Sequence, residues 1–88
     1  MKIVEGFVLR NVMGQAAVIG EGVGQVSFDK LITLNDSAAY LWQSVEGIEF
    51  EISDLAKLLV DRYHIDYQCA LQDAETLVNQ WINLGIVE

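Results

Sequence analysis

The chain has 88 residues, 52% of them hydrophobic, which suits one folded domain and argues against intrinsic disorder. Thirteen acidic residues against five basic ones give a net charge of −8, and the basic residues are scattered along the chain. This balance disfavours nucleic acid and anionic membranes, because both need clustered Lys and Arg, and it favours a neutral or basic peptide or protein partner.

Cysteine content and the N-terminal residues indicate the compartment. A single cysteine, Cys69, excludes an internal disulfide and leaves no thiol pair for a metal ion. The N-terminal residues include an early Glu5 and no long apolar run, so we expect no signal peptide. No segment approaches the roughly 20 apolar residues of a membrane span. We therefore expect a cytoplasmic protein.

The first third of the chain predicts a small antiparallel sheet. Residues 7–12 (FVLRNV) and 16–20 (AAVIG) are rich in strand-forming residues, and the Met-Gly-Gln tripeptide between them is typical of a turn. Residues 26–34 predict a short hairpin arm, VSF and LITL around an Asp-Lys pair, that leads into the last strand. We expect three main strands within about residues 7–34.

The remainder predicts three helices, over about residues 36–46, 53–63 and 67–84. Asn35, Ser53 and Asp66 are suitable N-caps, since their side-chain oxygens accept N–H groups of the first helical turn. Gly47 ends the first helix, and Gly85 closes the last one in a Schellman motif. Short turns join the helices, so we expect them to pack closely.

Each predicted helix has one apolar stripe that we assign to the core. The stripes are Ala38, Leu41, Trp42 and Val45; Leu55, Leu58, Leu59 and Tyr63; and Leu71, Ala74, Leu77, Val78, Trp81 and Leu84. Strands followed by helices, without a linker or an internal repeat, predict a single α+β domain over residues 1–88. We expect a winged helix-turn-helix-like fold with a small three-stranded antiparallel sheet followed by a three-helix bundle.

Three segments have a distinctive order. They are LNDSAAYLW…VEG (34–47), ISDLAKLLVDRYHID (52–66) and DAETLVNQWINLGIVE (73–88). In this order they resemble the PqqD-like family, named for coenzyme PQQ synthesis protein D, although each alone is a common helix motif. The resemblance covers about residues 30–88; the Gly-rich stretch between the strands is longer than in the family's namesake.

The resemblance implies a non-catalytic peptide-binding domain that needs no cofactor. Such a domain holds the leader of a ribosomally made precursor peptide and presents the rest to a modifying enzyme, often a radical-SAM protein. It further implies that the leader adds as a strand to the edge of the third strand and lies against the third helix. In this chain that edge is Lys30, Leu31, Ile32, Thr33 and Leu34.

The residues themselves also favour this role. An edge strand presents unpaired N–H and C=O groups that a protein must block or use, and LITL contains no charge and no Pro. An extended peptide pairs along such an edge while pockets select alternate side chains. On the third helix we expect contacts along one flank of the apolar stripe: Leu71, Glu75, Val78, Asn79 and Ile82. In this interpretation Val78 and Ile82 floor an apolar pocket, and an acidic rim favours a leader with Lys or Arg.

Alternative interpretations of the same residues remain open. In one of them, another part of the chain covers the LITL strand, and Val78 and Ile82 are ordinary core residues. In another, two copies of the chain pair through this edge, so the protein is a weak homodimer instead of a monomer. DNA binding by a winged helix is disfavoured, because residues 67–88 contain no Lys or Arg for phosphate and guanine contacts.

Other candidate sites have simpler structural explanations. GEGVGQ lacks the Lys and Ser/Thr of a phosphate-binding loop. His64 has no second His and no Cys pair with which to bind zinc. Cys69 has no acid at a useful spacing to orient a His base, so we assign it a structural role. We therefore expect no metal site and no enzymatic activity.

Overall fold

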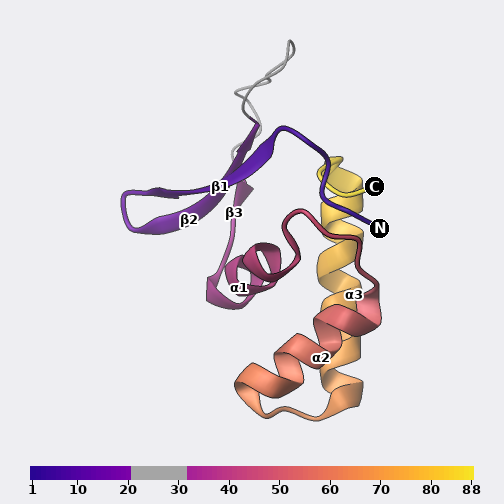
Figure 1. Ribbon diagram of the computed structural model, residues 1–88. Helices are drawn as coiled ribbons and strands as arrows, with labels where there is room; N and C mark the ends of the chain where they lie inside the picture. The colour runs from indigo at the N-terminus through magenta and orange to yellow at the C-terminus, as the bar shows by residue number, and fades with distance from the viewer. Residues whose placement is uncertain (21–31) are drawn as a thin grey trace.

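The computed structural model describes residues 1–20 and 32–88, which form a three-stranded antiparallel sheet followed by three helices (Figure 1). The elements are β1 (Phe7–Val12), β2 (Gln15–Gly20), β3 (Ile32–Thr33), α1 (Asp36–Val45), α2 (Ile52–Tyr63) and α3 (Tyr67–Leu84). The α+β class predicted from the sequence is confirmed. The strand predicted at VSF lies outside the described residues, as do Lys30 and Leu31.

Strands β1 and β2 form a hairpin that projects away from the helices (Figure 1). Its register runs from Phe7 opposite Gly20 to Val12 opposite Gln15. The connecting turn has two residues, Met13 and Gly14, both with positive φ (55° and 82°). Such turns match the right-handed twist of the strands, which explains a loop one residue shorter than the sequence predicted.

Met13 is a poor residue for its position in this turn, because a side chain other than Gly, Asn or Asp is strained at positive φ. We expect Met13→Asn to raise the free energy of unfolding by about 0.5–1 kcal/mol, measured by urea denaturation. Gly14→Ala is the opposite control: no atom lies within 4 Å of the added Cβ, so only backbone strain acts, and stability should fall. A Met13→Asn variant no more stable than the parent would contradict this assignment.

The helix N-termini follow the predicted capping with one exception. Asn35 and Asp66 cap α1 and α3, each accepting a first-turn N–H through its side chain, at 2.9 and 3.1 Å. In α2 the cap is Glu51, not the predicted Ser53, and the Glu51 backbone N–H donates to the Asp54 carboxylate at 2.8 Å. The helix therefore begins one residue earlier than predicted. Across the described ranges, no helix has both the length and the apolar character to cross a membrane.

The core lies where α1, α2 and α3 meet the sheet. The predicted α1 stripe is buried throughout. Trp42 of α1 and Trp81 of α3 pack edge to face, with ring centroids 5.3 Å apart. On α3 the buried residues are Ala70, Ala74, Val78 and Trp81. The remaining apolar residues assigned to its core are less buried: Leu71 and Leu77 are half-buried and Leu84 is exposed.

The two ends of the chain lie side by side, which the sequence did not indicate (Figure 1). Lys2 and Glu88 exchange two backbone hydrogen bonds of 2.8 Å. The Met1 amino group donates to the Phe50 carbonyl at 2.9 Å, and the Phe50 N–H donates back to Met1 at 2.8 Å. These bonds attach the end of α3 to the segment between α1 and α2.

Candidate functional site

Among the described residues, none pairs with the backbone groups of Thr33 at the outer edge of β3. Ala17 lies opposite Thr33, and the Leu34 N–H donates to the Ala16 carbonyl at 2.9 Å. Hydrogen-bonded and non-bonded pairs alternate along an antiparallel ladder, so the Thr33 N–H and C=O point away from β2. Within residues 1–20 and 32–88, the strand order is β1-β2-β3, and no strand covers this side of β3.

The corner between β3 and α1 is held by several hydrogen bonds. The Gln15 side-chain amide donates to the Leu34 carbonyl at 2.7 Å, which fixes the end of the strand. The Asn35 side chain then caps α1 by accepting the Ala38 N–H. The edge strand and the first turn of α1 consequently have a fixed relative position, with Leu34 buried between them.

A narrow groove of about 130 Å³ separates β3 from α3. Ile32, Thr33 and Leu34 line one wall. The α3 wall consists of Leu77, Gln80, Trp81 and Leu84. Asn35, Ala38, Leu77 and Gln80 also line a larger cavity, so the two hollows adjoin each other.

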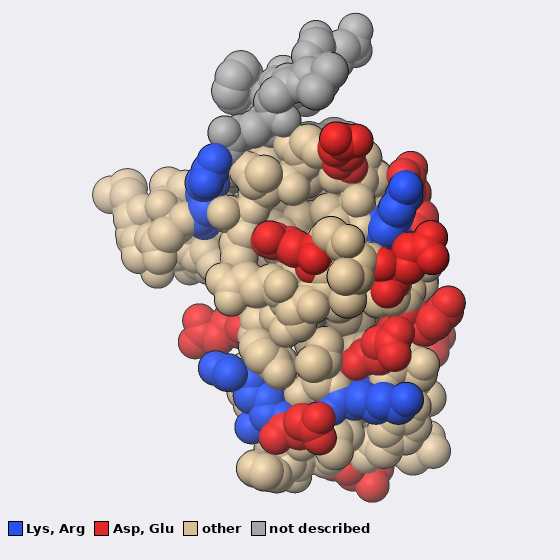
Figure 2. All heavy atoms as spheres, in the orientation of Figure 1, with Lys and Arg blue, Asp and Glu red and all other residues tan. Residues whose placement is uncertain are grey.

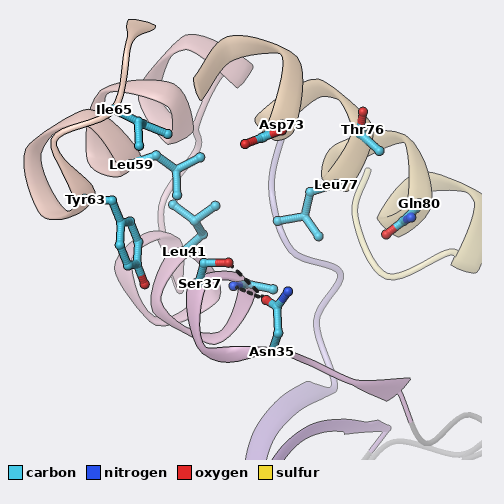
Figure 3. Close-up of a pocket in the computed structure, with 11 residues that line it drawn as sticks. Asn35, Ser37, Leu41, Leu59, Tyr63, Ile65, Asp73, Thr76, Leu77 and Gln80 are labelled. Carbon is cyan, nitrogen blue, oxygen red and sulfur yellow. Dashed lines mark hydrogen bonds between the residues drawn. The ribbon is translucent and has the colours of Figure 1, made fainter. Parts of the chain in front are cut away.

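The larger cavity, of about 530 Å³, lies between α1, the end of α2 and α3 (Figure 3). Its apolar wall comprises Ala38, Leu41, Leu59, Ile65 and Leu77, together with the ring of Tyr63. Its polar lining comprises Asn35, Ser37, Asp73, Thr76 and Gln80. Figure 3 shows Leu41 and Leu59 facing Leu77 across the space, with Asp73 at the end opposite Asn35. The cavity thus combines an apolar interior with polar ends, as peptide and small-molecule sites do.

A cluster of aromatic and cationic side chains supports the Tyr63 wall. The Tyr40 and Tyr63 rings meet edge to face, with centroids 6.5 Å apart. The Arg62 guanidinium lies 4.4 Å from the Tyr40 ring centroid and 5.8 Å from that of Tyr63. Cation–π contacts of this kind stabilise exposed sites by about 0.5–1 kcal/mol each. Arg62 therefore helps to keep Tyr63 against α1.

The structure places the predicted site residues that it describes in four different locations. Ile32, Thr33 and Leu34 line the groove as expected. None of the five predicted α3 residues lines the groove or the larger cavity beside it. Val78 is fully buried in the core, and Ile82 is half-exposed elsewhere on the helix. Leu71, Glu75 and Asn79 line a separate hollow with Gln68 and Cys69.

The predicted contact residues and the residues that line the groove lie on different flanks of α3. With about 3.6 residues per turn, Leu77, Gln80 and Leu84 lie on one side of the buried stripe, and Glu75 and Asn79 lie on the other. The helical periodicity of the sequence identifies both flanks of the stripe, but it does not indicate which one faces the sheet. A usable signal was the width of the predicted stripe. The predicted apolar stripe has six residues, and α3 buries only some of them. The others, Leu77 and Leu84 among them, were therefore available to line a site.

Charge is sparse in the groove and cavity. Among residues 1–20 and 32–88, Asp73 is the only charged residue that lines either hollow. Elsewhere on the face shown in Figure 2, acidic side chains predominate over Lys and Arg. Throughout the part of the chain that the structure describes, His, Cys, Asp and Glu form no group of three or more suited to a metal ion.

Comparison with known proteins identifies a family. A family model described as Coenzyme PQQ synthesis protein D (PqqD) matches residues 18–87. The matched span includes β3 and all three helices, and so contains both walls of the groove. No curated protein and no solved structure gives a significant match.

Proposed function

Because the chain belongs to the PqqD family, we propose that it is a non-catalytic recognition domain for the leader segment of a ribosomally made precursor peptide. The leader adds to β3 as an extra strand and lies in the groove beside α3. The domain then presents the rest of the precursor to a modifying enzyme, for which a radical-SAM protein is our candidate. Holding the peptide near that enzyme raises its effective concentration.

The observation that carries this proposal is the free backbone of Thr33 next to an apolar groove. A strand added at this edge gains hydrogen bonds to the Thr33 N–H and C=O, each contributing about 0.5–1.5 kcal/mol net. One apolar side chain buried in the groove contributes about 1.5–3 kcal/mol. The backbone ladder is short, so we expect it to set the register while the groove supplies most of the affinity.

Pairing of two copies through the same edge is less well supported. The described part of β3 has two residues, whereas a stable dimer buries about 1,200–2,000 Å² in total. We propose that the chain acts as a monomer, or at most as a weak homodimer that an added peptide dissociates.

Gln80 and Asn79 offer a matched test, because they are neighbours on opposite flanks of α3 and are both exposed. Gln80 lines the groove and the cavity, and Asn79 lines neither. We expect Gln80→Trp to fill the groove and weaken peptide binding by about tenfold or more, a loss of about 1.4 kcal/mol. Asn79→Trp should bind as the parent does.

The probes for this test are peptides selected from a random display library on the full chain, with affinities measured by isothermal titration calorimetry. Circular dichroism checks that both variants fold. Loss of binding in Asn79→Trp with binding retained in Gln80→Trp would favour the flank predicted from the sequence and would overturn the groove described above.

A further inference from the structure

Of the described residues that line the cavity beside the groove, one is charged, and it has no charged partner among the described residues. Asp73 lines the cavity from α3, and no Lys or Arg in residues 1–20 or 32–88 pairs with its carboxylate. The other lining residues are neutral. The nearby cation, Arg62, lies against the rings of Tyr40 and Tyr63, on the α1–α2 side.

The rest of the cavity suits an apolar group. Leu41, Leu59 and Leu77 face one another across it, and Ile65 extends this surface (Figure 3). A volume of about 530 Å³ holds more than one side chain. A Lys or Arg side chain matches such a surface well, because its hydrocarbon stem packs on apolar residues while its charged head stays near water and an acidic partner.

We propose that the peptide segment recognised by this domain combines an apolar residue with a Lys or Arg that pairs with Asp73. This inference rests on the proposed function and specifies its ligand. The apolar residue fills the space among Leu41, Leu59 and Leu77. The basic residue lies at the Asp73 end, since Arg62 repels a second cation at the Tyr63 wall. Asp73 is therefore a specificity determinant for a basic leader.

The test compares peptides selected from a random display library on three full-length proteins: the parent, Asp73→Asn and Glu75→Gln. Glu75→Gln is the matched control, because it also removes one negative charge, two residues away on the other flank of α3. We expect the parent and Glu75→Gln to enrich peptides with Lys or Arg at a fixed distance from an apolar residue. Asp73→Asn should retain the apolar preference and lose the basic one.

Calorimetry on one selected peptide gives the size of the effect. Replacing its basic residue by norleucine should weaken binding to the parent by about threefold to fivefold, the range of a partly exposed ion pair, and should not change binding to Asp73→Asn. If the selected peptides lose binding in Gln80→Trp but show no preference for Lys or Arg, this inference is overturned and the proposal of binding in the groove stands. Selection of no peptide that Gln80→Trp affects overturns the proposed function as well.

Discussion

Replacing Thr33 by proline should sharply weaken peptide binding and leave the fold intact. The Thr33 N–H points away from β2, so its loss removes no hydrogen bond of the β2–β3 ladder, and proline is tolerated at such an edge position. The preceding residue, Ile32, is already in a strand, the conformation that a following proline favours. A bound peptide loses a donor and meets the proline ring. We expect the affinity to fall by more than about tenfold in calorimetric titration.

Two controls make this result specific to the Thr33 backbone. Thr33→Val retains the N–H and removes only the hydroxyl, so it should retain most of the affinity. Leu34→Pro removes the N–H that donates to Ala16, and should lower the thermal unfolding temperature. A folded Thr33→Pro variant with the parent's affinity would exclude strand addition in this register.

The largest effect on stability should come from Trp42→Ala. Trp42 is fully buried and packs edge to face on Trp81, so truncation leaves a large cavity between α1 and α3. Such substitutions cost about 3–5 kcal/mol, while a domain of this size is stable by only about 4–13 kcal/mol. We expect a large fall in the urea midpoint of unfolding, measured by circular dichroism.

Trp42→Phe is the informative comparison. The Trp42 indole N–H is buried without a hydrogen-bond acceptor among residues 1–20 and 32–88, which costs about 1–3 kcal/mol. Phenylalanine removes this unpaired group and retains a ring beside Trp81. The loss of stability in Trp42→Phe should therefore be much smaller than in Trp42→Ala, and equal losses in the two variants would contradict this view of the core.

Local sequence signals were sufficient for most of the fold. Asn35 and Asp66 mark helix starts because a capping side chain acts on its own first turn. Gly85 marks the end of α3, where the Ile86 N–H returns to the Trp81 carbonyl at 3.1 Å. These features depend on neighbours within one turn of helix, so a single sequence determines them.

The features that were missed depend on contacts between distant parts of the chain. Lys2 pairs with Glu88 without any local motif at either end. The flank of α3 that faces β3 depends on how the helix packs against the sheet, and this packing exposed Leu84 and placed Leu77 in a groove. The sequence therefore predicted the edge at Ile32 and Thr33, but not which α3 residues line the groove opposite it.

The corner from β3 into α1 connects the two parts of the proposed site. Gln15 fixes the Leu34 carbonyl, and Asn35 both caps α1 and lines the groove. In the proposed complex, a peptide paired at Thr33 continues past this corner towards the apolar cavity. In the proposed function, the short strand β3 and the helix α1 therefore bind the peptide together.

Amide hydrogen exchange at Thr33, followed by NMR with and without a saturating peptide selected from a random display library, tests strand addition most directly. We predict that the Thr33 amide becomes protected when the peptide binds. The Leu34 amide should change little, because it already donates to Ala16 within the sheet. A Thr33 amide that exchanges equally fast in the saturated complex would contradict binding along β3.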